Sequence, residues 1–525
     1  MTLSPLQQRA SEIVTELRPE LSKFHRDIWS YSESAWREYR SVRRYVDRLR
    51  EEGFDVEEGS GGMPTAFHAS WGEGGPEIGM YAEYDATPGY SQDTVPYRKP
   101  REGLHPWAPG FTDAHSALGV GALAGAIATK RALDESGVKG TVRFFGEPAE
   151  KVCGSKAVHA AKGYYNTLDA AISYHPYFHS TAYWEITNCL YWSAVFTFQC
   201  PEDVPWVKEM DTNHNLSSHN LVRSPGAIDA LSMMINTTKV TRENMFPSSG
   251  SWTLNEAILG ASTATADNLA PRITQIQFSW RSPLIGIQEQ ILGILVNNAK
   301  HVAAITNTEV SLRWVTKTRP GLANHALTTA LFDNLSILGA PEFGEEAVRF
   351  ANEVEKSLGF EPSEDPFIPQ TRMLVTPQET DERMRSNLPP WQECTGADDY
   401  TEYSWHAPTV RFFTARPILK KTGLNHFYWP NNSMNGLAAA IDPCWERGGQ
   451  TIATTAVQLA EDPKLLAAAK AEFEERRGRA DARFLSPLLP EDFQPPIELP
   501  WPEYVQTARG FEWTLPTTDY FGERL

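Results

Sequence analysis

The stretch Thr141–Pro176, TVRFFGEPAEKVCGSKAVHAAKGYYNTLDAAISYHP, decides the fold. Its two apolar runs, Thr141–Phe145 and Ala170–Tyr174, predict buried strands, and the segment from about Ser155 to Gly163 predicts a helix between them. Buried strands that are joined through a helix lie parallel in one sheet. This stretch therefore predicts a parallel sheet that helices cover on both faces.

The same pattern extends toward the N-terminus. The apolar run Glu77–Tyr84, EIGMYAEY, predicts a further strand that ends in the turn Asp85–Gly89. The segment Ser116–Leu133 is rich in Ala and Gly and predicts a helix packed closely on the sheet. We therefore expect an α/β fold with a mostly parallel sheet sandwiched by helices.

The character of the chain changes near Tyr191, where strands and helices suit a small α+β domain of four antiparallel strands. Its predicted strands and helices are Tyr191–Gln199, Ile273–Trp280, Glu309–Trp314, Ala227–Thr237 and Ile287–Ala304. We expect this domain to be an insertion into the larger one. The predicted boundaries are residues 1–190 and 321–486 for the two parts of the main domain, 191–320 for the insertion, and 487–525 for a Pro- and aromatic-rich tail that wraps along the surface.

Composition limits the class of partner. Asp and Glu outnumber Lys and Arg by 66 to 48, which argues against nucleic acid or an anionic membrane surface as a partner. No signal peptide pattern stands at the N-terminus, and no apolar run reaches the roughly 18 residues of a membrane span. Five scattered cysteines without CxxC spacing fit a reducing cytoplasm. We expect a cytoplasmic protein with a small-molecule substrate, no nucleic acid and no membrane.

Three short strings place carboxylates and imidazoles at the ends of predicted elements. Asp113 and His115 precede the predicted helix, and Glu150 and His175 follow the two buried strands. Such side chains converge on one crevice in an α/β sheet, as a metal-assisted hydrolase requires. Glu150 is placed to take a proton from a metal-bound water and pass it to a leaving amine.

Each of these residues also has an ordinary structural interpretation. Asp113 is a suitable N-cap for the following helix, and Glu150 suits the first turn of a helix on the surface. A lone histidine such as His175 is more often a hydrogen-bonded core residue. Further along, the acidic turn around Asp399 is either solvated or holds an imidazole in one tautomer, and the spacing of His426 carries no signal.

Taken in serial order, these strings resemble the metal-dependent aminoacylase and carboxypeptidase family (peptidase family M20-like). Within it they are most similar to the aminobenzoyl-glutamate hydrolase and auxin-conjugate amidohydrolase branch. Ala82–Gly89, AEYDATPG, is similar to AEYDALPG of that branch, and Tyr174–Pro176 to its His-Pro. Asn268–Pro283 resembles its lid segment that ends in Arg-Ala-Pro, and Asp399–Trp405 its acidic string before Ser-Trp.

The resemblance implies a zinc-exopeptidase-like catalytic domain that is interrupted by a lid through which two chains form a homodimer. It also implies hydrolysis of an amide that joins an acyl or aryl group to an amino acid, with two divalent ions, zinc or manganese. The family's residues fall here on Asp113, His115 and His175 as metal ligands, Glu150 as base, and His426 as a further ligand. Its substrate-binding positions fall on Asn268 and Arg281, and His214 or His219 would reach the active site of a neighbouring chain. Asp85 and Asp399 would support the metal ligands through hydrogen bonds.

Lys151 departs from the family, which has a metal-binding glutamate at this position. An ammonium has no lone pair, and at ~4 Å it repels a divalent ion by about 8 kcal/mol at an effective dielectric near 20. We therefore expect one metal ion, with the Lys151 ammonium in place of the other. There it would steady an anionic group of the substrate or a developing oxyanion.

Two alternatives stay open from the sequence. One is a degenerate member that binds a small molecule or partner without hydrolysis. The other is a changed reaction at the same site, such as removal of an aryl amine or opening of a ring amide.

Overall fold

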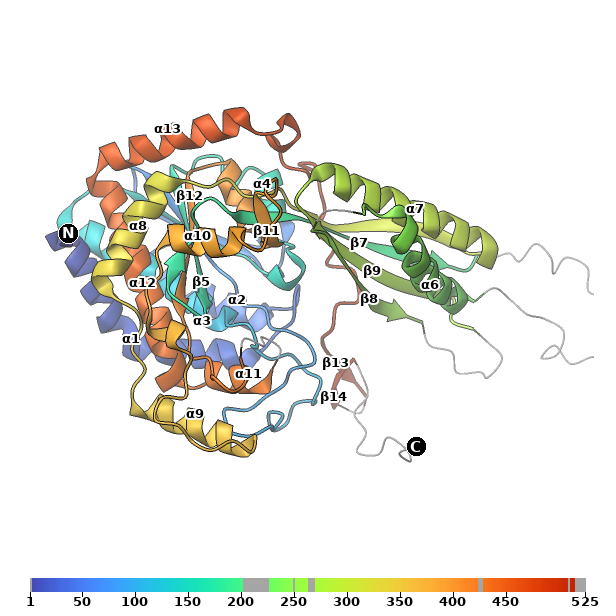
Figure 1. Cartoon of the computed structure of the whole chain (residues 1–525), viewed down its shortest axis with the longest axis horizontal. Coiled ribbons are helices and arrows are strands. Elements are labelled where there is room, and N and C mark those ends of the chain that lie inside the picture. The colour runs from blue at the N-terminus through green and yellow to red at the C-terminus, as the bar shows by residue number, and fades with distance from the viewer. Residues whose placement is uncertain are drawn as a thin grey trace, which may run out of the picture.

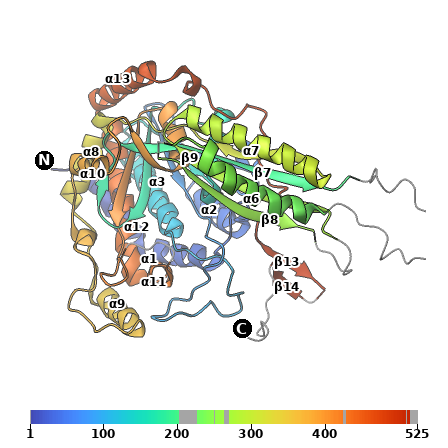
Figure 2. The same ribbon diagram turned by 45° about the vertical axis from the view of Figure 1, so that its right-hand side comes forward.

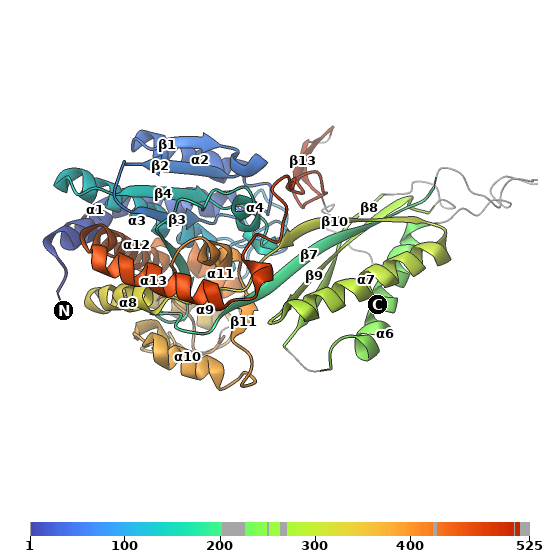
Figure 3. The ribbon, with the colours of Figure 1, turned by 90° about the horizontal axis from the view of Figure 1, so that it is seen from above.

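The computed structural model describes residues 2–201, 226–248, 251–262, 270–423, 428–508 and 510–514. Its larger part, which we call the body, is built on a seven-stranded sheet in the order β1-β2-β4-β3-β5-β12-β6 (Figures 1 and 3). The bounds of these strands are β1 Asp55–Glu58, β2 Phe67–Trp71, β3 Glu77–Ala82, β4 Thr141–Gly146, β5 Ala170–Tyr177, β6 Thr181–Ala182 and β12 Thr409–Ala415. The four central strands β4, β3, β5 and β12 are parallel, and β1, β2 and β6 pair antiparallel at the edges.

Helices cover both faces of this sheet, as the alternating pattern predicts. The helices of the body are α1 Pro5–Tyr31, α2 Tyr39–Glu51, α3 His115–Ser136, α4 Lys156–Ala161, α8 His325–Leu338, α9 Glu345–Ser357, α10 Pro377–Arg385, α11 Trp429–Asn435, α12 Ala438–Glu461 and α13 Pro463–Arg479. Short 3-10 helices are η1 Ser60–Gly62, η2 Glu150–Val152, η4 Pro369–Arg372, η5 Asp399–Trp405 and η6 Ala482–Phe484.

Ala82 and Tyr81, two neighbouring residues of β3, point to opposite faces of the sheet, and both faces are covered. A Cβ on Gly119 of α3 would lie 3.2 Å from the Cβ of Ala82 and 2.7 Å from a backbone oxygen, so the glycine permits α3 to lie closely on the sheet. Tyr81 points the other way and stacks on Tyr403 of η5, with ring centroids 5.2 Å apart. The fold class expected from the sequence is therefore confirmed.

The second sheet lies beside the body in a unit that we call the arm, made of β7 to β10 with α6 and α7 (Figures 1 and 2). Its elements are β7 Thr187–Gln199, α6 Ala227–Met245, β8 Thr253–Ala261, β9 Ile273–Ser282, α7 Ile285–Thr306 and β10 Glu309–Lys317. The strands run antiparallel in the order β10-β7-β9-β8, and α6 and α7 cover one face. A fifth strand, β11 Cys394–Ala397, joins the start of β7 in parallel, which the four-strand expectation left out.

The chain after η6 crosses the other face of the arm sheet, and we call the described residues 487–508 and 510–514 the strap. Leu489, Phe493, Leu499 and Trp501 are buried there in one cluster with side chains of both the arm and the body. The strap then forms the hairpin of β13 Tyr504–Thr507 and β14 Gly510–Trp513 (Figure 2). Among the described helices, none combines the length and the apolar character that crossing a membrane requires.

Candidate active site

The predicted residues meet where the parallel strands end. Glu83 and Asp85 follow β3, Glu150 follows β4, and His175 lies near the end of β5. His115 begins α3, whose N-cap is Ala114 with no side-chain cap, so the carboxylate of Asp113 does not have the capping role that the sequence also allowed. The side chains converge because parallel strands deliver their carboxyl ends to one edge of the sheet.

Lys151 stands at the centre of this cluster. Its Nζ lies 3.0 Å from Asp113 Oδ2, 3.2 Å from Glu150 Oε2 and 2.8 Å from His115 Nε2. The side chain is 19% exposed, so these charges interact in a partly dry environment. An ammonium thus occupies the point on which two carboxylates and an imidazole converge.

Asp85 holds two members of the cluster in place. Its Oδ1 lies 2.8 Å from His115 Nδ1, and a carboxylate can only accept, so this ring nitrogen carries the proton and Nε2 faces the cluster. Its Oδ2 accepts a hydrogen bond of 2.8 Å from the backbone N–H of Lys151. Asp85 therefore orients both the imidazole and the turn that carries Glu150 and Lys151.

A second ammonium lies behind the first. Lys156 Nζ donates to Glu83 Oε1 at 2.8 Å and to Asp399 Oδ1 at 2.6 Å, and all three side chains are fully buried. Asp399 thus pairs with a lysine rather than with an imidazole. Neither Glu83 nor Lys156 was predicted from the sequence, although Glu83 lies in the AEYD string and Lys156 begins the helix after Glu150.

His175 presents a free nitrogen to the cluster. Its Nδ1 donates to the carbonyl oxygen of Pro176 at 2.7 Å, which leaves Nε2 facing Asp113 Oδ1 at 3.6 Å. Burial lowers the pKa of His175 to about 4, so the ring is neutral at pH 7. A neutral imidazole with a fixed tautomer is the form that binds a metal ion.

The charges shift the other pKa values in opposite directions. Burial acts to raise the pKa of Glu150, but the Lys151 ammonium and His115 outweigh it and hold this pKa well below its ordinary value. Burial acts to lower the pKa of Lys151, yet Asp113 and Glu150 raise it above its ordinary value. Burial and Lys151 act to lower the pKa of His115 as well, but Glu83 and Asp113 carry it above its ordinary value, so Lys151 and His115 together bring positive charge to the carboxylates of the cluster.

The candidate donor set for one divalent ion is Glu83, His115 and His175, and an ion there would have to displace the Lys151 ammonium from His115 Nε2, 2.8 Å away. Ligand atoms of Glu83, His115 and His175 all lie within 4.8 Å of one another. Glu83 Oε2 is buried, makes no hydrogen bond to the described residues and lies 3.2 Å from His115 Nε2. A second ion on Asp113 and Glu150 does not fit, because the Lys151 ammonium is already there.

The remaining predicted residues divide into two groups. Arg281 lies on β9, its guanidinium 5.4 Å from the ring centroid of Tyr191, and its buried Nε has no hydrogen-bond partner in the described chain. Four others lie outside the described residues: His214, His219, Asn268 and His426.

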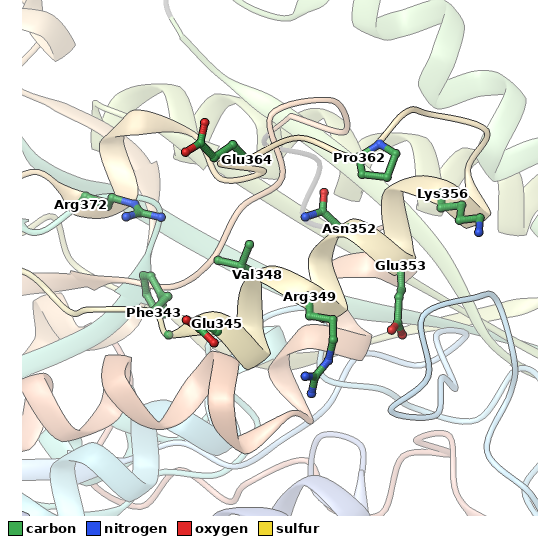
Figure 4. A pocket seen from close by; sticks show the side chains of 11 residues that line it. Phe343, Glu345, Val348, Arg349, Asn352, Glu353, Lys356, Pro362, Glu364 and Arg372 are labelled. Carbon is green, nitrogen blue, oxygen red and sulfur yellow. The ribbon is translucent and has the colours of Figure 1, made fainter.

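An open groove of about 700 Å³ lies elsewhere, along α9 (Figure 4). Glu345, Glu353, Arg349 and Lys356 line it with charges of both signs, and none of the cluster residues takes part. We assign the groove no part in the chemistry.

Comparison with known proteins supports the resemblance found in the motifs. No protein-family model matches the chain. The chain is 28% identical over 335 residues to one of the subunits of the p-aminobenzoyl-glutamate hydrolase of Escherichia coli, a match that covers 63% of this chain and 65% of that protein. The expected likeness to the aminobenzoyl-glutamate hydrolase branch is thereby confirmed, over slightly less than two thirds of the relative's length.

Solved structures also align with the chain. An aminobenzoyl-glutamate utilization protein from Klebsiella pneumoniae aligns with a TM-score of 0.48 and 13% identity, over 82% of this chain and 98% of that one. A dinuclear metal-binding peptidase of the M20 family from Bacillus subtilis aligns with a TM-score of 0.44 and 15% identity, over 85% and 99% of the two chains.

Proposed function

We propose that this protein is a metal-dependent amidohydrolase that cleaves the C–N bond of a small N-acyl or N-aroyl amino acid. One observation carries the proposal: Glu150, a buried divalent-ion donor set and a resident ammonium meet at the carboxyl edge of the parallel strands. The match to a p-aminobenzoyl-glutamate hydrolase supports the substrate class.

The ion would be zinc or manganese, one per chain, held by Glu83, His115 and His175, with Asp113 beside them. When bound, it would supply Lewis acidity and lower the pKa of the attacking water. His426, which lies outside the described residues, stays a proposed further ligand. Asp85 would keep His115 Nε2 directed at the ion through its bond to Nδ1.

Glu150 would move the proton. Its carboxylate is held by Lys151 and lies 3.2 Å from His115 Nε2, so it borders the position where an attacking water would stand. It would accept a proton from the water as the C–O bond forms, and then donate that proton to the leaving nitrogen as the C–N bond breaks. The products are a carboxylic acid and an amine.

Lys151 would serve as the second cation. A unit positive charge at this point can stabilise the oxyanion that develops on the amide carbonyl oxygen, a role that metal ions, Lys and Arg share. Because the ammonium already contacts Asp113 and Glu150, it is pre-oriented and needs little rearrangement during the reaction.

The arm would act as a lid and as the dimer contact. Arg281 is the arm residue whose guanidinium suits the substrate carboxylate, with Asn268 and a partner-facing His214 or His219 proposed beside it. The edge strand β8 exposes Ile258 to 60%, which favours a homodimer formed along this edge. We retain the domain division 1–190, 191–320, 321–486 and 487–525, and a cytoplasmic location, as parts of the proposal.

A second function is favoured by Lys151 itself. If the ammonium blocks the whole ion site, the cluster would bind a small anionic molecule without hydrolysing it, or would act on a ring amide or an aryl amine.

A screen of N-acetyl, N-benzoyl and N-(p-aminobenzoyl) amino acids, read by release of the free amino acid, tests the proposal. We expect turnover by the zinc- or manganese-supplemented wild type and a loss of about 10²–10⁴-fold in Glu150→Gln. Glu353→Gln, in the groove of Figure 4, is the control and should match the wild type. Binding of these compounds without turnover would favour the second function.

A further inference from the structure

The turn Ala149–Gly154, which carries Glu150 and Lys151, has an unfavourable backbone. Ala149 and Cys153 adopt left-handed conformations, with φ of 57° and 49°. A non-glycine residue in this region costs about 1–2 kcal/mol, so such a turn persists only where its surroundings hold it.

The segment Ser32–Glu38 between α1 and α2, which we call the linker, supplies that hold. Of the five non-glycine residues with positive φ in the described chain, two lie in the turn and two, Ser32 and Trp36, lie in the linker. The Trp36 ring fills the space beside Gly154, because a Cβ on Gly154 would stand 2.4 Å from Trp36 Cζ2. The two strained segments therefore pack against each other.

Glu38 makes the polar contact between them. Although it stands at the N-cap of α2, its side chain makes no capping bond to that helix. Its Oε1 instead accepts a hydrogen bond of 2.7 Å from the backbone N–H of Ala149, and the side chain is fully buried. Glu33 takes over the first turn of α2, accepting from the backbone N–H groups of Arg40 and Ser41 at 2.8 and 2.9 Å.

The linker is anchored on its other sides. The carbonyl oxygen of Glu33 accepts a hydrogen bond of 2.7 Å from the backbone N–H of Ala86, the residue after Asp85. Arg37 contacts the strap twice. Its guanidinium donates a hydrogen bond of 3.1 Å to the carbonyl oxygen of Leu499 and forms an ion pair of 3.0 Å with Glu503. The linker thus ties together Asp85, the Glu150 turn and the strap.

We propose that Glu38 and Trp36 are positioning residues, which hold the Ala149–Gly154 turn so that Glu150 and Lys151 meet the cluster. Glu38 acts through its hydrogen bond to Ala149, and Trp36 through contact with Gly154. This inference rests on the proposed function for its kinetic consequence, but its structural part does not depend on hydrolysis.

The test compares Glu38→Ala, Glu38→Gln and the wild type. Glutamine keeps an oxygen that accepts from Ala149, whereas alanine removes it. We expect Glu38→Ala to lower kcat at least about tenfold with KM within about twofold, and Glu38→Gln to restore kcat, because leaving the buried N–H of Ala149 without an acceptor is worth about tenfold or more. Glu355→Ala is the matched control, since it removes another fully buried carboxylate, on α9.

A second readout reports the turn itself. Cys153 is buried at the end of the turn, so its alkylation by iodoacetamide, followed by peptide mass spectrometry on the folded protein, measures how often the turn opens. We expect alkylation of Cys153 to be about tenfold faster in Glu38→Ala and unchanged in Glu38→Gln and Glu355→Ala.

The outcomes separate the two proposals. If Glu38→Ala matches Glu355→Ala in both kcat and alkylation, the positioning role is wrong. If Glu38→Gln is as impaired as Glu38→Ala, the Glu38 charge rather than its acceptor oxygen matters, and the stated mechanism is overturned. If the wild type hydrolyses no amide, the proposed function fails, while the alkylation rates still decide the positioning role.

Discussion

Lys151 determines the charge balance of the site. Its ammonium bridges Asp113 and Glu150 and contacts His115, so removing it leaves two carboxylates close together without a counter-ion. Removing one partner of a largely buried pair costs more than the pair itself contributes, since the remaining charge stays desolvated.

We therefore expect Lys151→Met to lower the free energy of unfolding by about 2 kcal/mol in chelated buffer. Zinc or manganese should restore much of it, because an ion that binds only the folded state stabilises that state. Thermal melts with and without metal measure both effects. Lys470→Met, which removes a 46% exposed partner of Asp169, should change stability by less than about 1 kcal/mol and show no metal-dependent rescue. Equal metal responses in the two variants would contradict this.

The sequence predicted part of the site at this scale. Asp113, His115, Glu150 and His175 come together because each stands at an end of a strand or helix that the hydrophobic pattern places correctly. Glu83 and Lys156 were missed because nothing local distinguishes a fully buried ion pair from surface charges. Its partners are 73 residues apart along the chain, and only the packed fold shows them together.

At the scale of elements, the Ala149–Gly154 turn has no room for an added side chain. We expect Gly154→Ala to cost about 1–3 kcal/mol of stability and to lower hydrolysis, since the new Cβ would meet the buried Trp36 ring. Gly286→Ala in α7 is the control, because its Cβ would enter open space and alanine favours a helix. Urea unfolding measures the stability of the two variants, and an amide hydrolysis assay measures their activity. A Gly154→Ala protein with wild-type stability and activity would show that the turn is loosely packed.

The strap gives a second test. Trp501 is 3% exposed and lies between the arm and the body, whereas Phe511 at the hairpin is 69% exposed. We expect Trp501→Ala to lower the free energy of unfolding by about 3–5 kcal/mol and Phe511→Ala by less than about 0.5 kcal/mol. Denaturant titration checks the difference, and equal effects would mean that the strap does not join the two parts.

Elements with regular patterns were predictable, and irregular ones were not. The strands β3, β4 and β5 are apolar runs that the sequence places within a few residues. The strand β11 escaped because the short segment Cys394–Ala397 has no apolar alternation and pairs with β7, about two hundred residues earlier. The packing of the strap likewise depends on side chains from distant parts of the chain.

At the scale of the whole molecule, the exposed edge of the arm sheet bears on assembly. We expect a dimer in solution, and we expect Ile258→Lys on the edge strand β8 to convert it to a monomer, because charge on an edge strand opposes pairing. Phe360→Lys in the body, at a 40% exposed position, is the control. Size-exclusion chromatography with light scattering measures both, and an Ile258→Lys protein that stays dimeric would place the interface elsewhere.

Our proposal that one divalent ion and the Lys151 ammonium share the site makes the metal content of the chain decisive. Elemental mass spectrometry of the wild type purified without chelator, beside Lys151→Glu, tests it most directly. We predict about one zinc or manganese ion per wild-type chain and about two in Lys151→Glu, since the glutamate would remove the repulsion and add a ligand. Two ions in the wild type would contradict the claim.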